Sequence, residues 1–161
     1  MVMGTAWPWK PNDQFKTTTT LIRNLCRIVA RNGNYLIGIG PDGNGEFDPV
    51  VYDRLKEMGA WLKLNGEAIY NTRPVKPYEQ ADCVFTGKRD GTVYAIILTD
   101  NLPETVTLPA ELTAKAGKIT LLGFGSLNSD DAGNITIPAA AQSKPPCAHA
   151  WTIKLTPRKT Q

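Results

Sequence analysis

The segment Tyr35–Ile39, with the sequence YLIGI, constrains the fold more than any other part of the chain. Its apolar residues are nearly continuous, which is typical of a strand that is covered on both faces within a parallel sheet. Such a strand also needs neighbouring strands to pair with along its edges. The run therefore predicts a parallel sheet with helices packed on it.

An amphipathic helix is predicted on each side of this run. The first covers residues 17–31, where preceding threonines can cap its first turn. The second begins at Asp48-Pro49, because Asp can cap a helix and Pro suits its first position. Asn-Gly pairs at 32–33 and 65–66 end the two helices. Their apolar stripes are Leu21, Leu25, Ile28 and Val29 in the first, and Val51, Leu55, Met58 and Leu62 in the second.

The pattern changes after about residue 70. Residues 71–77 are predicted as an irregular connector, followed by two strands joined by a hairpin turn at Lys88–Gly91, where Asp-Gly favours a tight turn. Further short strands are predicted at 104–108, 118–122, 134–137 and 150–155, separated by turns rich in Pro and Gly. Short strands without an intervening helix favour a small antiparallel β-sandwich. The predicted fold is thus α/β plus all-β, divided into residues 1–72 and 73–161.

The loop between the first strand and the second helix contains GIGPDG, which fits the G-x-G-x-x-G pattern of dinucleotide-binding proteins. That motif requires the helix to begin within the glycines, and here it begins only at Asp48. Pro41 removes a donor, and the acidic side chains of the loop would repel a phosphate. A calcium loop is excluded as well, because Phe47 and Asp53 occupy the positions of its Gly and its bidentate Glu. We therefore predict a wide, solvated loop.

Composition narrows the remaining classes of function. The chain is 42% hydrophobic and 20% charged, which is enough apolar material for a core. Its formal charge is +3, and its basic residues are scattered, so we expect no nucleic-acid partner. Cys26, Cys83 and Cys147 match no metal-ligand spacing, and we expect neither metal nor cofactor. No stretch reaches the about 20 apolar residues that span a bilayer, and the first residues lack a signal-peptide pattern.

The stretch 18–74 resembles the end of the catalytic barrel in the α-L-fucosidases of glycoside hydrolase family 29. The shared motifs are a helix followed by NGN, an apolar strand, IGPDGNG, a helix ending in GAWLKLNGEAIY, and TRP. AWPW at 6–9 is similar to the Ser-Trp-Gly-Tyr motif of that family. The resemblance implies that residues 1–72 form the last βα unit of a (β/α)8 barrel, and that 73–161 correspond to the C-terminal β-sandwich domain.

The resemblance also implies a retaining hydrolase that removes terminal α-L-fucose from glycans. Retaining glycosidases use two carboxylates about 5 Å apart. In this family both, an Asp nucleophile and a Glu acid/base, lie on earlier strands of the barrel, so we expect them upstream of this chain. We therefore expect this chain alone to be inactive. Its apolar surface is then predicted to bind an upstream barrel segment or to drive self-association. The compartment remains unassigned, since family members are often secreted, periplasmic or lysosomal.

Within the resemblance, Trp7 is the predicted substrate-binding residue, where the family places a ring against the apolar face and methyl group of the sugar. The Asp42–Glu46 loop is expected at the rim of the active site. Two departures fall nearby, because Gly38 stands where the family usually has Asn and Pro8 where Gly is usual. Glu67, Trp61 and His149 are expected to have structural roles. The alternative function is a non-catalytic β-sandwich module that binds carbohydrate or protein.

Overall fold

The computed structural model describes residues 1–158, so the last three residues of the predicted second domain lie outside the described part. Both predicted helices are confirmed, as α1 (Thr18–Ala30) and α2 (Pro49–Asn65), the latter continued by a short 3-10 turn, η1 (Gly66–Ala68). The Thr17 side chain accepts a hydrogen bond from the N–H of Thr20, and that of Asp48 accepts one from Val50. These are the caps that the sequence indicated.

The prediction of a regular β-strand at Tyr35–Ile39 is wrong. The segment is extended, but in residues 1–158 its only β-pairing is an isolated parallel bridge between Val2 and Gly38. Gly38 donates to the carbonyl of Met1 over 2.8 Å, and its own carbonyl accepts from Met3 over 3.0 Å. Leu36, which the pattern placed in a core, is 73% exposed. An apolar run becomes a strand only where neighbours pair with it, and here one short segment does so.

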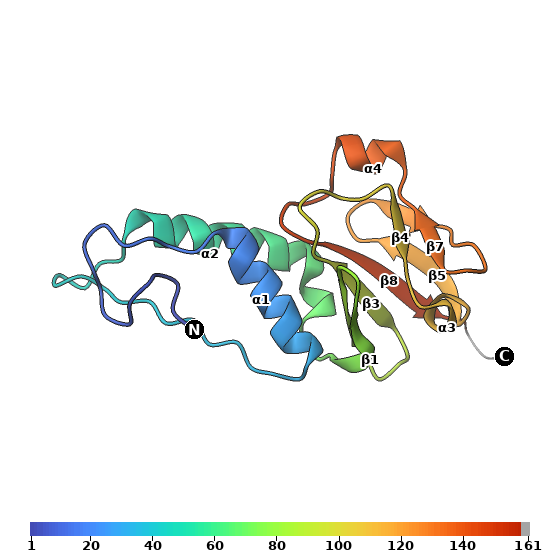
Figure 1. Ribbon diagram of the computed structural model, residues 1–161, viewed down its shortest axis with the longest axis horizontal. Coiled ribbons are helices and arrows are strands. Elements are labelled where there is room, and N and C mark those ends of the chain that lie inside the picture. The colour runs from blue at the N-terminus through green and yellow to red at the C-terminus, as the bar shows by residue number, and fades with distance from the viewer. Residues whose placement is uncertain (159–161) are drawn as a thin grey trace.

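Between residues 73 and 158, eight strands form two antiparallel sheets (Figure 1). A six-stranded sheet has the order β1-β2-β3-β8-β5-β6, and a two-stranded sheet pairs β4 with β7. The hairpin at Lys88–Gly91 is confirmed, because Lys88 donates to the carbonyl of Thr92 and Gly91 has a φ of +86°. The strand bounds are β1 Arg73–Gln80, β2 Cys83–Gly87, β3 Val93–Ile97, β4 Thr105–Thr107, β5 Ala116–Leu121, β6 Gly125–Leu127, β7 Asn134–Thr136 and β8 Trp151–Pro157.

Three details of this region were missed. The predicted connector is strand β1, which tolerates Pro74 and Pro77 because it lies at the edge of the sheet. Strand β6 has only three residues and begins at a glycine, so it carries no periodic signal. Two short helices, α3 (Ala110–Thr113) and α4 (Ala139–Ser143), occur where none was expected.

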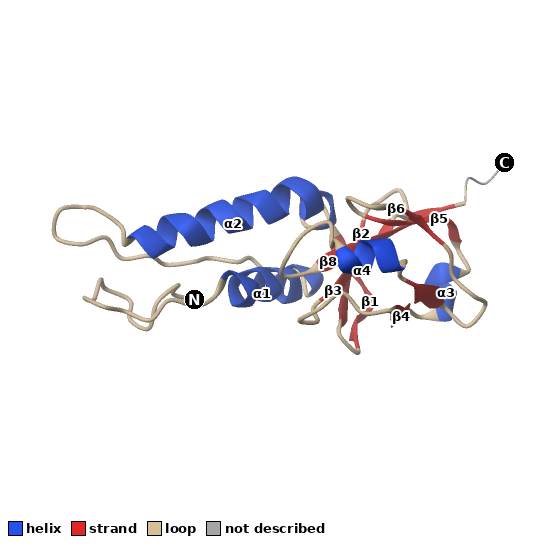
Figure 2. Cartoon of the chain, turned by 90° about the horizontal axis from the view of Figure 1, so that it is seen from above, coloured by secondary structure: helices blue, strands red, loops and turns tan. Residues whose placement is uncertain are grey.

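The six-stranded sheet buries both of its faces (Figures 1 and 2). One face packs against the two-stranded sheet through residues such as Phe85, Ile135 and Ile153. The other face, with Val84, Tyr94 and Ile96, shares a second core with α1 and α2. The structure is therefore a mixed helix and antiparallel-sheet fold. This second core crosses the predicted boundary at 72/73, and that boundary stays a prediction.

The most buried face of helix α1 shares only Leu21 with the apolar stripe that the sequence predicted. Its fully buried residues are Leu21, Ile22, Cys26 and Ala30, which pack toward β1 and β2. Leu25, Ile28 and Val29 are only partly buried. The helix thus has one face against the antiparallel sheet and a second apolar face that the described residues cover incompletely.

Candidate active-site rim

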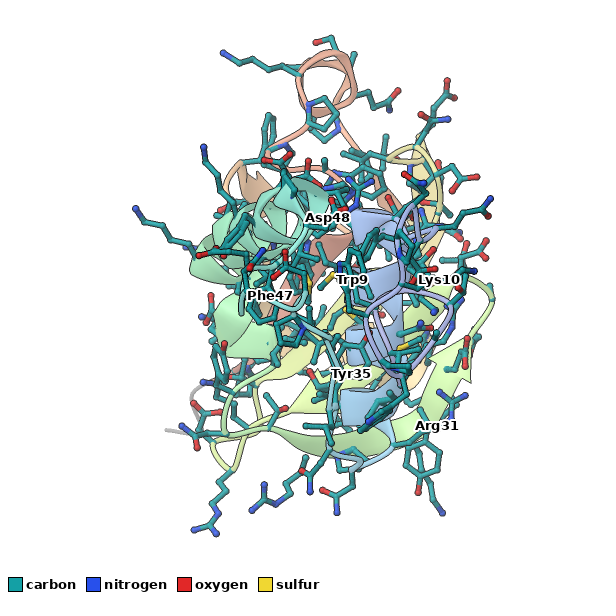
Figure 3. The ribbon with its side chains drawn as sticks, turned by 90° about the vertical axis from the view of Figure 1, so that its left-hand side faces the viewer. Trp9, Lys10, Arg31, Tyr35, Phe47 and Asp48 are labelled. Atoms are coloured by element: carbon teal, nitrogen blue, oxygen red, sulfur yellow. The ribbon has the colours of Figure 1, made fainter. Side chains whose placement is uncertain are left out.

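The Val2–Gly38 bridge brings two extended segments side by side in the same direction. The chain leaves the first segment through the turn at residues 7–9 and the second through the loop at residues 40–48. Both connections therefore follow the carboxyl ends of neighbouring parallel segments. Ligand sites of α/β folds lie at this end of the strands. This geometry makes the two connections the candidate rim of a site, seen end-on in Figure 3.

Trp7, the predicted substrate-binding residue, lies on this rim with 72% of its surface exposed. Its Cζ3 atom is 3.4 Å from the position that a Cβ on Gly38 would occupy. The first departure from the family pattern thus lies in contact with Trp7. A Cβ at position 38 would make an ordinary van der Waals contact with this indole.

Hydrogen bonds between the Asp42 side chain and backbone N–H groups hold the Asp42–Glu46 loop in shape. The carboxylate of Asp42 accepts N–H donors from Asn44 at 2.8 Å and from Glu46 at 2.9 Å. These hydrogen bonds, that of Glu46 first, lower the pKa of Asp42. Asp13 has the same role in the neighbouring turn, where it accepts from the N–H and the hydroxyl of Thr5, and its pKa is lowered as well. Both acids stabilise turns as carboxylates.

The pKa shifts of the described carboxyl groups all have the same direction. A catalytic acid that works near neutral pH needs a raised pKa. Each carboxyl group of residues 1–158 with a clear shift has a lowered pKa instead: Asp13, Asp42, Glu57, Glu67, Glu79, Asp90 and Asp130. Burial raises the pKa of the Cys83 thiol to about 12, so it stays protonated and unreactive. Within the same residues, no group of three His, Cys, Asp or Glu side chains is arranged to hold a metal ion.

The three residues expected to be structural join the helices to the sheet. Glu67 accepts hydrogen bonds from the Tyr94 hydroxyl at 2.9 Å and from Lys154 Nζ at 2.6 Å. The buried Trp61 donates from Nε1 to the carbonyl of Ala150 at 2.8 Å. His149 Nδ1 lies 2.8 Å from the hydroxyl of Thr19, and burial lowers the pKa of this imidazole. Each is occupied by contacts that hold the fold together.

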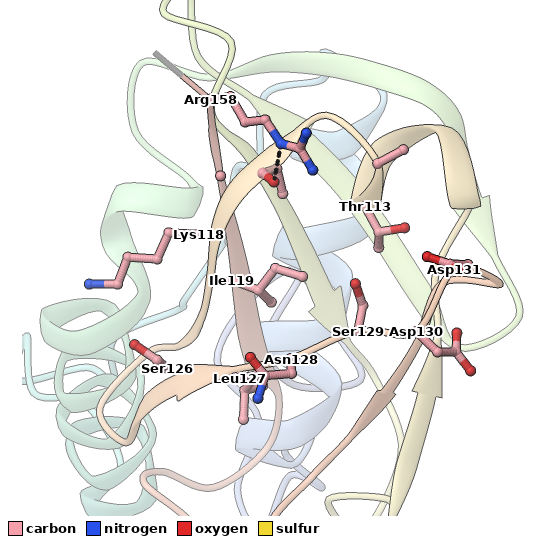
Figure 4. A pocket seen from close by; sticks show the side chains of 13 residues that line it. Thr113, Lys118, Ile119, Ser126, Leu127, Asn128, Ser129, Asp130, Asp131 and Arg158 are labelled. Carbon is pink, nitrogen blue, oxygen red and sulfur yellow. Dashed lines mark hydrogen bonds between the residues drawn. The ribbon is translucent and has the colours of Figure 1, made fainter.

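Residues 1–158 also form hollows away from the rim segments, and the sequence analysis identified none of them. A polar groove of about 420 Å³ runs between α3 and the ends of β5 and β6, with Lys118, Asp130 and Arg158 on its sides (Figure 4). A mainly apolar hollow of about 570 Å³ lies between α2 and residues 146–149. Their walls come from segments far apart in the chain, which local sequence patterns do not connect.

No helix of the described residues is long and apolar enough to cross a membrane.

Comparison with known proteins identifies the relatives of this arrangement. Residues 1–67 match the family described as alpha-L-fucosidase, and residues 77–156 match the alpha-L-fucosidase C-terminal domain. The tissue alpha-L-fucosidase of Homo sapiens is 37% identical over 145 residues, which are 84% of this chain and 31% of that protein. That of Bos taurus is 34% identical and aligns with 94% of this chain and 34% of its own length.

The fold agrees with a solved structure. Alpha-L-fucosidase isoenzyme 1 from Paenibacillus thiaminolyticus superimposes with a TM-score of 0.86 at 26% identity, over 99% of this chain and 39% of that one. Sequence and fold together place the chain among the glycoside hydrolases. Within that class it belongs to the α-L-fucosidases of glycoside hydrolase family 29. The chain spans about a third of the length of the relatives it matches.

Proposed function

We propose that this chain is the C-terminal portion of a retaining α-L-fucosidase that hydrolyses terminal α-L-fucosyl bonds, and that residues 1–72 supply the last βα unit of its (β/α)8 barrel. The observation that carries the proposal is the parallel bridge between Val2 and Gly38. Parallel pairing is what neighbouring barrel strands make, and the connections that follow hold Trp7 and the Asp42–Glu46 loop.

The proposed division of labour follows from the chemistry of retention. One carboxylate attacks the anomeric carbon and forms a glycosyl-enzyme intermediate, while the other protonates the leaving oxygen and then activates water. Both carboxylates are assigned to the upstream barrel, as the family resemblance implies, and Asp13 and Asp42 on this rim are engaged in turns. The role of this chain is to bind the sugar, with Trp7 packing against the methyl group and C–H bonds of fucose.

A second part of the proposal concerns the partner of the helical region. Leu36, Tyr52 and Leu55 are exposed, and Leu25 and Ile28 are only partly covered. Apolar surface of this kind marks an interaction site. We assign it to the upstream barrel segment, which would pair with the free edges of the extended segments. Without that segment, the same surface drives association between copies of this chain.

The test begins with the DNA upstream of the codon for Met1. The proposal expects the reading frame to continue through an Asp and a Glu at the ends of predicted barrel strands. The chain alone and the extended polypeptide are then assayed on an aryl α-L-fucoside, and nuclear magnetic resonance follows the anomeric configuration of the first product. The extended enzyme should release α-L-fucose with retention, and the chain alone should remain at the buffer rate. Turnover by the chain alone that one substitution within residues 1–161 abolishes would overturn the assignment.

A further inference from the structure

The backbone of the Trp7-Pro8-Trp9 turn lies directly on Gly40. A Cβ built on Gly40 would be 2.5 Å from the backbone nitrogen of Trp9 and 3.0 Å from the carbonyl carbon of Pro8. Because these atoms belong to the main chain, no side-chain rotation would relieve the contact. Any other residue at position 40 would therefore displace the turn. Gly43, three residues further along the same loop, has no atom within 4 Å of its Cβ position and carries no such constraint.

The four tryptophans fall into two classes. Trp61 and Trp151 are 2% and 4% exposed, and their indole N–H groups donate to backbone carbonyls at 2.8 and 2.9 Å. Trp7 and Trp9 are 72% and 43% exposed, and their indole N–H groups have no hydrogen-bond partner among residues 1–158. Tryptophan is mostly buried in folded proteins, and its N–H usually finds a partner. Two exposed rings with free donors, two residues apart, are ready to bind an amphipathic ligand.

The neighbours of these rings favour a glycan over a polypeptide core as that ligand. Seen from this end of the molecule, Figure 3 shows Trp9 in the same region as Phe47 and Lys10. The surrounding turns carry exposed polar and charged side chains, including Lys10, Asn12, Asn44 and Glu46, together with the half-buried Asp42. Burying such groups under a protein domain would be costly, whereas sugar hydroxyls can bind to them. A pyranose also presents C–H bonds on one face, which suits an aromatic ring.

From these observations we infer that Trp9 is a second sugar-binding ring, which takes the residue next to the terminal fucose, and that Gly40 is the positioning residue that holds both rings on the rim. The inference rests on the proposed function for the identity of the sugar. The inference adds a second sugar subsite to the proposed function. It also adds Gly40, whose lack of a side chain allows the turn with both rings to lie against it. The expected contribution of the Trp9 ring is a two- to tenfold change in affinity, the range of about 0.5–1.5 kcal/mol measured for aromatic contacts.

The experiment uses the chain labelled with nitrogen-15, in which each indole N–H gives its own signal, assigned by replacing one tryptophan at a time with phenylalanine. Methyl α-L-fucoside is expected to shift the Trp7 signal, and fucosyllactose to shift those of both Trp7 and Trp9. The signals of Trp61 and Trp151 should stay in place and report that the protein is folded. Trp9→Phe should weaken fucosyllactose but leave methyl α-L-fucoside unchanged. A Trp9 signal that ignores fucosyllactose would refute the second subsite.

The positioning role of Gly40 is tested in the same spectra. Gly40→Ala should move the Trp7 and Trp9 signals without any sugar and weaken the response of both to fucosyllactose. Gly43→Ala, the matched control, should leave all four signals and the titration unchanged. Equal behaviour of the two variants would overturn the role of Gly40. These readouts do not depend on hydrolysis, so failure of the proposed activity can be distinguished from failure of this inference.

Discussion

Two apolar runs of five residues in this chain differ in their strand pairing and burial. Val93–Ile97, with the sequence VYAII, is strand β3, paired with β2 on one side and β8 on the other. Its last four residues are buried between the two cores. Tyr35–Ile39, with the sequence YLIGI, has the same character but makes one parallel bridge and leaves Leu36 in solvent. An apolar run forms a buried strand only where other strands of the same chain pair with it. The chain provides such strands for residues 93–97 but not for residues 35–39.

The largest difference should appear when each run loses one side chain. Ile96→Ala removes a residue that is fully buried between the sheet and the helices, and should lower the free energy of unfolding by about 2–5 kcal/mol. Leu36→Ala removes an exposed side chain and should change it by less than about 0.5 kcal/mol. Urea denaturation followed by circular dichroism measures both. If Leu36→Ala were as destabilising as Ile96→Ala, residues 35–39 would belong to a closed core of their own.

A smaller contrast is expected between two turns with the same backbone conformation. Gly91 in the β2–β3 hairpin and Gly45 in the loop after the extended segment both have a φ of +86°. Gly91→Val forces a β-branched residue into a left-handed turn between paired strands, and should cost about 1–3 kcal/mol. Gly45→Val meets no neighbouring atom, and its loop can rearrange without breaking a sheet. Its melting temperature should therefore fall less. An unchanged melting temperature for Gly91→Val would contradict the role of this turn.

The incompletely paired segment Tyr35–Ile39 should also control the self-association of the chain. The isolated chain is expected to scatter light as oligomers, and Leu36→Lys should reduce that scattering because it places a charge on the exposed apolar segment. Tyr70→Lys is the control, since Tyr70 is also exposed but follows α2 on the side of the sheet. It should scatter like the parent chain. A monomer that is independent of dilution and binds no hydrophobic dye would show that the surface needs no partner.

How far the sequence predicted the structure follows from the same contrast. Signals that act within a few residues were sufficient: the caps at Thr17 and Asp48, and the Asp-Gly turn at Gly91. The β1 edge strand was missed, because its two prolines oppose a strand locally while its pairing with β2 depends on distant residues. On the candidate rim, the proposal for Trp7 rests on its motif, whereas the proposal for Trp9 and Gly40 needs the contact between two segments thirty residues apart. Contacts between distant segments carry no local periodicity.

The smallest effect concerns the polar junction between the helical region and the sheet. Glu67, just after α2, accepts hydrogen bonds from Tyr94 on β3 and Lys154 on β8. Burial alone would raise its pKa, but the hydrogen bonds of Lys154 and Tyr94 outweigh burial, so the pKa lies below its ordinary value of 4.5. A carboxyl group with a lowered pKa in the folded state stabilises the protein above the ordinary pKa. That stability is lost as the pH falls through the folded-state value.

Glu67→Gln should therefore reduce the free energy of unfolding at pH 7 by about 0.5 kcal/mol, the scale of a partly exposed ion pair. The difference from the parent chain should shrink below pH 4, where the parent loses the same charge. Urea denaturation at pH 7 and pH 3 measures the change. Glu46→Gln is the matched control, because its carboxylate has no ion-pair or hydrogen-bond partner within residues 1–158. If Glu67→Gln lowered the free energy of unfolding by as much at pH 3 as at pH 7, the packing of this side chain, and not its charge, would stabilise the junction.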